Sequence, residues 1–189
     1  MKIGDRMAKI MKRIAFVATV ITVLCVLFYI NTGTGLALTL SITFATISYH
    51  FIMRLLVGFF INRLLNNRVD YQRTWFRVSD AEQRFYKAIK VRAWKGSMPT
   101  YDPSFFDVGI HTWDEIAQAM CQAELVHEVI IVLSFLPILT AVPFGAGLVF
   151  VLTSAAAACY DAMFVIMQRY NRQRIVKLIE KARKKGSWT

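Results

Sequence analysis

Four long apolar stretches constrain the fold more than any other feature of the sequence. They cover about residues 14–30, 36–61, 113–137 and 145–168 of the 189-residue chain. A helix of about 17 or more apolar residues is long enough to cross the hydrocarbon layer of a bilayer. The sequence therefore predicts an all-α integral membrane protein, in which four transmembrane helices form a bundle and a single membrane domain.

Positively charged residues gather on one side of these predicted spans. The chain contains 23 lysines and arginines against 12 acidic residues, which gives a formal net charge of +11. All of the 23 except Arg54 lie before the first span, in the segment 62–112, or in the basic tail 169–189. The two opposite loops, residues 31–35 and about 138–144, carry no charge. Cytoplasmic segments hold the excess of Lys and Arg in membrane proteins. We therefore expect a multi-pass protein of the cell membrane with both termini and the segment 62–112 in the cytoplasm, where the charge meets anionic lipids rather than nucleic acid.

The first apolar run has one alternative interpretation. Basic residues precede it and small residues follow it, as in a secretory signal peptide. The second run begins after only the turn-forming residues 31–35, and this spacing favours a retained helical hairpin. The three cysteines all lie inside apolar runs, so they support neither a disulfide framework nor a zinc site.

The segment 62–112 is the longest stretch predicted to lie outside the membrane. Residues 80–95 predict a helix in the plane of the headgroups, with Phe85 on its apolar side and Lys87 on its basic side. Trp94 is a residue type that favours this depth. The sequence Thr112-Trp113-Asp114-Glu115 then matches a capping box and predicts the start of the third membrane helix.

Six charged or histidine side chains lie deep within the predicted spans, beyond the first turn of each helix, where each costs roughly 2.5 to 3.5 kcal/mol to insert. The second span carries His50 and Arg54, the third Glu124, His127 and Glu128, and the fourth Asp161. At a rise of about 1.5 Å per residue, Arg54, Asp161 and the three residues of the third span lie about 8 to 14 Å from the cytoplasmic boundary, so the group is interpreted as one polar layer. Ionisable residues inside spans are usually retained for function, so we expect the functional site in this layer.

His127 and Glu124 are the predicted catalytic pair. They are three residues apart and so lie on one broad face of the third helix. A histidine held by a carboxylate serves as a general base near neutral pH, and in a membrane its expected task is to deprotonate a hydroxyl. Arg54 is the candidate for stabilising the oxyanion or the acyl carbonyl. The alternative is that these groups only join the helices, with Arg54 paired to Glu128 or Asp161.

Other chemistries find less support in the sequence. Glu124 and His127 have the Glu-x-x-His spacing of di-iron bundles, but those need the motif twice and the chain has only three histidines. No metal site is therefore predicted, and His111 is interpreted as a solvated loop residue. Cys121 is placed to carry an acyl group as a thioester, although a buried cysteine is more often a small packing residue. The sequence has neither a glycine-rich phosphate loop nor a Gly-x-Ser-x-Gly elbow.

Three stretches of the chain carry a family resemblance. They are Glu82 with residues 84–95 (Arg-Phe-Tyr-Lys-Ala-Ile-Lys-Val-Arg-Ala-Trp-Lys), residues 123–127 (Ala-Glu-Leu-Val-His) and residues 168–172 (Gln-Arg-Tyr-Asn-Arg). Over about residues 75–185 the chain resembles the glycosyl-4,4'-diaponeurosporenoate acyltransferases, bacterial membrane proteins of carotenoid (staphyloxanthin) biosynthesis. The resemblance implies esterification of a sugar hydroxyl on a membrane-embedded glycolipid by a fatty acyl group. Gln173 departs from the family pattern, which has proline there.

The predicted site combines positions that match the family with polar residues of the spans. The predicted catalytic residues are His127, Glu124, Arg54 and Glu82. The predicted substrate-binding residues are Trp94, Lys95, Arg169, Asn171, Arg172, Glu128, Asp161 and His50. Among these, the three cationic side chains Lys95, Arg169 and Arg172 are expected to contact a headgroup or coenzyme A. Asn171 and Glu82 are expected to orient the rim, whereas His50 and Arg54 have no counterpart in the family pattern.

The expected partners are membrane lipids and two substrates. The resemblance implies a glycosylated carotenoid or a similar lipid-linked sugar as acceptor. The acyl donor is a co-substrate, either acyl-coenzyme A, an acyl carrier protein or a phospholipid, and no tightly bound cofactor is expected. Two other functions stay open: an ion or proton conductor that uses the polar layer as a relay, and a lipid-binding assembly factor. A lateral apolar cavity ending at His127 would favour the enzyme, and a polar pore through all spans would favour the conductor.

Overall fold

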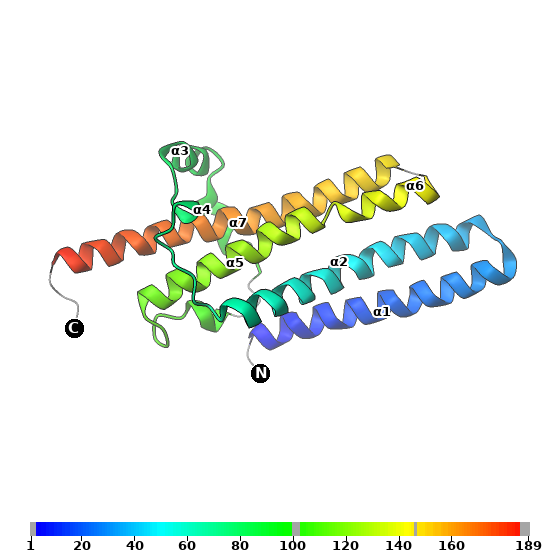
Figure 1. Ribbon diagram of the computed structural model, residues 1–189, viewed down its shortest axis with the longest axis horizontal. Coiled ribbons are helices and arrows are strands. Elements are labelled where there is room, and N and C mark those ends of the chain that lie inside the picture. The colour runs from blue at the N-terminus through cyan, green and yellow to red at the C-terminus, as the bar shows by residue number, and fades with distance from the viewer. Residues whose placement is uncertain (1–2, 100–102, 146, 186–189) are drawn as a thin grey trace.

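The computed structural model describes residues 3–99, 103–145 and 147–185, and every regular element among them is a helix (Figure 1). Four stretches are long and apolar enough to cross a membrane, namely Met7–Thr32, Gly35–Leu65, Trp113–Phe144 and Gly147–Lys184. The first, second and fourth belong to the helices α1 (Ile3–Thr32), α2 (Gly35–Leu65) and α7 (Gly147–Lys184). The predicted all-α membrane fold with four spans is confirmed.

The third membrane stretch is built from three consecutive helices. α5 (Trp113–Leu133) begins at the predicted capping box, in which Thr112 and Glu115 exchange side-chain and backbone hydrogen bonds. The 3-10 helix η4 (Leu136–Thr140) and the short helix α6 (Ala141–Phe144) follow. Residues 138–144, which were expected to form a loop, are therefore helical. The chain turns at Gly145, whose φ of 71° favours glycine.

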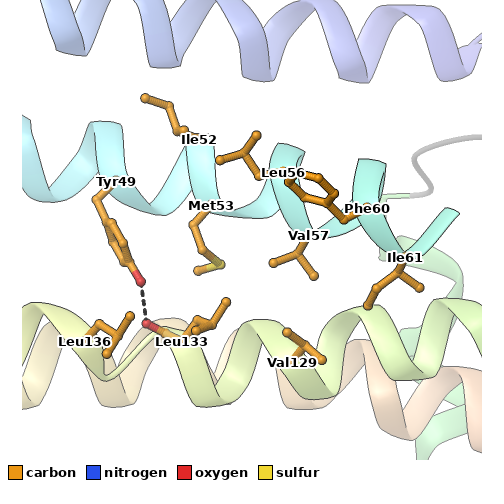
Figure 2. Close-up of a pocket in the computed structure, with 10 residues that line it drawn as sticks. All are labelled: Tyr49, Ile52, Met53, Leu56, Val57, Phe60, Ile61, Val129, Leu133 and Leu136. Atoms are coloured by element: carbon orange, nitrogen blue, oxygen red, sulfur yellow. Dashed lines mark hydrogen bonds between the residues drawn. The ribbon is translucent and has the colours of Figure 1, made fainter. Parts of the chain in front are cut away.

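Pro137 explains why α5 ends where it does. Proline has no N–H, so it cannot donate to the carbonyl four residues earlier, which here belongs to Leu133. The hydroxyl of Tyr49 on α2 takes this place and donates to the Leu133 oxygen at 2.8 Å (Figure 2). The carbonyl group left free where α5 is interrupted thereby forms a hydrogen bond that joins α5 to α2.

The four long helices pack in chain order. α1 and α2 form an antiparallel hairpin around Gly33, whose φ is 64°, and α5 and α7 form a second hairpin (Figure 1). The two hairpins meet along α2 and α5, where Met53, Val57 and Ile130 form an apolar cluster. α2 and α7 consequently run in the same direction, which fixes the order of their polar residues across the membrane.

The segment between α2 and α5 folds into short helices. They are η1 (Thr74–Phe76), α3 (Asp80–Ala88), α4 (Val91–Trp94), η2 (Lys95–Ser97) and η3 (Pro103–Phe106). The helix expected over residues 80–95 is divided in two, because Lys90 adopts a left-handed conformation with φ of 50°. Both α3 and α4 contact α7 and lie toward the end of the molecule where the termini are found (Figure 1).

The basic segment expected to form a tail from residue 169 is instead the last part of α7. The helix continues without interruption to Lys184. Arg169 and Arg172 therefore belong to the same rigid helix as the span, and their side chains face the segment that carries η1 and α3. This placement removes them from bulk solvent and makes them part of the site described next.

Candidate functional site

Asp161 on α7 is the centre of a polar cluster that joins three helices. Its side chain is buried, with 1% of the residue exposed. One carboxylate oxygen, Oδ1, lies 2.9 Å from Nδ1 of His127 on α5. The other, Oδ2, accepts a hydrogen bond from Nη2 of Arg54 on α2. Three residues that are far apart in the sequence thus form one connected unit, and we call it the Asp161 cluster.

The His127 ring is held in a fixed orientation within this cluster. It stacks on Phe164, with the ring centroids 4.4 Å apart and the planes 5° from parallel. When Nδ1 donates to Asp161, Nε2 carries the lone pair and is the nitrogen able to accept a proton. The side chain is 21% exposed, and Nε2 has no hydrogen-bond partner among the described residues. The geometry therefore presents an oriented base to whatever occupies the adjoining space.

The carboxylate that holds His127 is Asp161, and the expected pairing of His127 with Glu124 is wrong. Glu124 is fully buried, and its two oxygens accept from Arg169 and Arg172 of α7. Side chains on an α-helix tilt toward its N-terminus, which in α5 is the end near α3. Glu124, one turn nearer that end than His127, is thereby directed at the arginines of α7 rather than at the imidazole.

Glu124, Arg169 and Arg172 form a second unit, which we call the arginine clamp. Arg169 also donates to Glu82 Oε1 at 2.9 Å and to the carbonyl oxygens of Trp75 and Arg77, each at 3.0 Å. Arg172, 1% exposed, donates to the Phe76 carbonyl at 2.7 Å, and its guanidinium lies 5.0 Å from the centre of the Phe76 ring. Both guanidinium groups donate their hydrogen bonds to other parts of the protein. Arg169 and Arg172 therefore hold neighbouring segments in position.

Glu82 holds α3 on this clamp. It completes the capping box with Ser79 at the start of α3, and it accepts hydrogen bonds from Arg169 and from the Tyr86 hydroxyl. Partial burial alone would raise the pKa of Glu82, but the Ser79 N–H and Arg169 outweigh burial and lower it. Burial and the nearby Glu82 carboxylate raise the pKa of Tyr86 to about 12. Glu82 is therefore an anionic structural contact at neutral pH.

The remaining family positions meet at the surface between α4, η2 and α7. Lys95 donates to the side-chain oxygen of Asn171, and its ammonium lies 5.2 Å from the centre of the Tyr170 ring. Partial burial, followed by the charges of Arg174 and Arg92, lowers the pKa of Lys95. Trp94 donates from its indole to the Ile89 carbonyl at 3.0 Å, which closes the bend between α3 and α4.

The comparisons with known proteins place this arrangement in a family. The sequence model of the glycosyl-4,4'-diaponeurosporenoate acyltransferases matches residues 70–181. The chain belongs to this family. Searches of the curated proteins and of the solved structures give no match. Membership of this family identifies the protein as an acyltransferase. Its four long apolar helices indicate that it is a membrane protein.

The family match covers one part of the Asp161 cluster and omits another. His127, Asp161 and the whole arginine clamp lie within residues 70–181. Arg54 and His50 belong to α2, which precedes the matched stretch. The two residues are linked by a hydrogen bond from Arg54 Nη1 to the His50 carbonyl at 3.1 Å. Both hairpins of this acyltransferase thus contribute to the cluster.

Two aromatic residues near the polar layer were not found from the sequence. Phe164 lies one turn after Asp161, a spacing that places both on one face of α7, and this was the available signal. Trp75 donates from its indole to Glu128 at 3.1 Å. No local pattern indicates this contact, because it depends on how the segment before α3 lies against α5. Glu128 is therefore turned toward Trp75 and not toward Arg54.

A lateral apolar groove lies between α2 and α5, with a volume of about 560 Å³ (Figure 2). Its lining comes from both helices and from the start of η4: Tyr49, Ile52, Met53, Leu56, Val57, Phe60, Ile61, Val129, Leu133 and Leu136. The expected cavity ending at His127 is not this one, since His127 does not line it. Successive helical residues differ by about 100° in direction, so His127 faces away from Val129 and Leu133. The groove and the Asp161 cluster lie on different sides of the α2–α5 contact.

No group of three or more His, Cys, Asp or Glu side chains suited to a metal ion occurs within residues 3–99, 103–145 and 147–185. Cys121 is fully buried next to Val69 and Phe76 in a small apolar cluster. This environment is that of a packing residue.

Proposed function

We propose that the protein transfers a fatty acyl group to a sugar hydroxyl of a membrane-embedded glycolipid, with a glycosyl carotenoid as the acceptor class. The observation that supports this most is the contact of His127 with buried Asp161 at 2.9 Å, with Arg54 on the far side of the carboxylate. The family match gives the reaction class. The Asp161 cluster gives the group able to perform its proton transfer.

In this mechanism His127 Nε2 removes the proton from the acceptor hydroxyl as the oxygen attacks the acyl carbonyl. A new ester bond forms, the bond to the donor's leaving group breaks, and the imidazolium returns the proton to that group. Asp161 holds the imidazole in the reactive tautomer and stabilises the imidazolium. Arg54 supplies the opposite charge that an ionised carboxylate needs in an apolar environment. This role replaces the oxyanion role first expected for Arg54.

The arginine clamp has a positioning role in this proposal. It fixes the segment that carries Trp75 and Phe76 against α5 and α7, next to the turn of α5 that bears His127. Lys95, Arg92 and Arg174 lie outside the clamp and form a cationic rim. We assign this rim to the anionic part of the acyl donor, a phosphate or an acidic carrier surface. Because membrane proteins keep their excess of Lys and Arg in the cytoplasm, we infer that the rim and the clamp face the cytoplasm.

The direct test is the variant His127→Ala in cells that accumulate the glycosylated carotenoid. Loss of a general base lowers the rate by about 10²- to 10⁴-fold, so the acylated product should disappear from the lipid extract. Lipid mass spectrometry measures the product, and quantification of the protein in the membrane fraction shows whether the variant is retained. The matched control is His111→Ala, a histidine outside both units, which should leave acylation unchanged. Normal acylation by His127→Ala would remove the base from the mechanism.

A further inference from the structure

His50 lies on α2 in the polar layer, and its imidazole lacks the hydrogen bonds that a buried ring needs. Both ring nitrogens are buried, and neither has a hydrogen-bond partner among the described residues. The ring packs edge-on against Tyr49, with the ring centroids 5.4 Å apart. The charges of Arg54 and Asp161 are close enough to interact electrostatically with the imidazole. A buried polar group without a hydrogen-bond partner destabilises the folded protein. The position therefore favours a polar ligand.

A second unpaired group lies on the same side of the Arg54–Asp161 pair. The hydroxyl of Ser154 on α7 is fully buried and has no partner in the described part of the chain. Ser154 precedes Asp161 by seven residues, which places both on one face of α7. His50 precedes Arg54 by four residues on α2. Because α2 and α7 run in the same direction, both unpaired groups lie beyond the pair as seen from the arginine clamp.

We propose that His50 binds hydroxyl groups of the acceptor sugar, and that it makes the enzyme select a glycosylated lipid over a simple lipid alcohol. This inference rests on the proposed function and names the group that recognises the acceptor. A neutral imidazole offers one N–H donor and one acceptor nitrogen. Neighbouring sugar hydroxyls supply both an acceptor and a donor, whereas an acyl chain or a polyene supplies neither.

His127 and His50 have different tasks in this assignment. One nitrogen of His127 is committed to Asp161, so only the other is open to the reacting hydroxyl. A single contact leaves the sugar ring free to rotate, and a second polar group is needed to orient it. His50 provides that contact from a helix that lies outside the stretch matched by the family. A buried hydrogen-bonding group of this kind rejects an analogue that lacks the hydroxyl, because its own nitrogens then stay unpaired.

The test compares the full chain with the variant His50→Phe in nanodiscs whose lipids carry no sugar. Dodecyl glucoside and dodecanol are added separately, and the melting temperature is followed, since a ligand that binds the folded state raises it. We expect His50→Phe to need about 10-fold more dodecyl glucoside for the same rise, and to respond to dodecanol like the wild type. Without ligand the variant should melt at the same temperature or higher, because two unpaired nitrogens are removed. His111→Phe is the matched control and should keep the wild-type response.

Turnover gives a second, independent readout. In the acylation assay His50→Phe should lower kcat/KM for the glycosylated acceptor about 10-fold. An equal response of wild type and His50→Phe to dodecyl glucoside would overturn the inference, as would equal weakening toward both lipids or a lower melting temperature without ligand. A wild type that binds the glucoside through His50 but acylates no acceptor would contradict the proposed function and leave this inference standing.

Discussion

At the scale of single residues, Asp161 carries the largest share of the site. It is nearly inaccessible, and it contacts a cation from one hairpin and an imidazole from its own hairpin. Removing one member of a buried pair leaves the other charge uncompensated, which is more costly than removing both. In the proposed mechanism the same carboxylate stabilises the fold through Arg54 and supports catalysis through His127, and the two roles are separable by mutation.

We expect Asp161→Asn to lower kcat by about 10²- to 10⁴-fold, because an amide neither fixes the reactive tautomer nor stabilises the imidazolium. It should also lower the melting temperature, because Arg54 keeps its charge without a counter-ion. Adding Arg54→Gln should restore the melting temperature and leave the activity low. Acylation rates measured by lipid mass spectrometry, together with melting curves, check both parts. Full activity in Asp161→Asn would show that His127 does not depend on this carboxylate.

At the scale of elements, the end of α5 shows how a helix break is used. Pro137 leaves the Leu133 carbonyl without its helical partner, and Tyr49 supplies a hydroxyl from α2. The contact borders the apolar groove and joins the two hairpins near the middle of α2 (Figure 2). The hydrogen bond from Tyr49 to Leu133 therefore couples the end of α5 to the packing of α2.

The variant Tyr49→Phe should lower the free energy of unfolding by roughly 1–3 kcal/mol, because the Leu133 oxygen loses its donor. Pro137→Ala provides a backbone N–H four residues after Leu133, so in the Tyr49→Phe background it should recover part of the loss. Reversible unfolding in mixed micelles measures each free energy. If Pro137→Ala further destabilises Tyr49→Phe, the break in α5 has another cause.

The elements themselves differ in how far the sequence predicts them. The capping box at Thr112 and the turn at Gly33 depend on neighbours within a few residues, and both were predicted correctly. The bend at Lys90 was not, because lysine gives no local signal for a left-handed conformation and the bend is closed by the Trp94 indole. The pairing of His127 with Asp161 also escaped prediction. It depends on how α5 and α7 are rotated against each other, and a sequence pattern within α5 holds no information about that rotation.

At the scale of the whole molecule, the charge distribution predicts the orientation in the membrane. The turn between α1 and α2 carries no charge, whereas the segment with α3 is strongly basic. We expect α3, the arginine clamp and the cationic rim to face the cytoplasm. This orientation would give a cytosolic acyl donor direct access to Lys95.

Single-cysteine variants of the otherwise cysteine-free protein test this orientation. Thr34→Cys, in the turn between α1 and α2, should react with a membrane-impermeant maleimide added to intact cells. Lys87→Cys, on α3, should react only after the cells are opened. Labelling is read as a mass shift on a gel. The opposite pattern would place the cationic rim outside the cell and would exclude a cytosolic donor.

Arg54 enters the Asp161 cluster from α2, which precedes the stretch shared with the family. The imidazole and its carboxylate thus belong to the hairpin of α5 and α7, and the cation that balances the carboxylate belongs to the hairpin of α1 and α2. Exchange of the first hairpin would therefore remove the cation and leave the imidazole with its carboxylate.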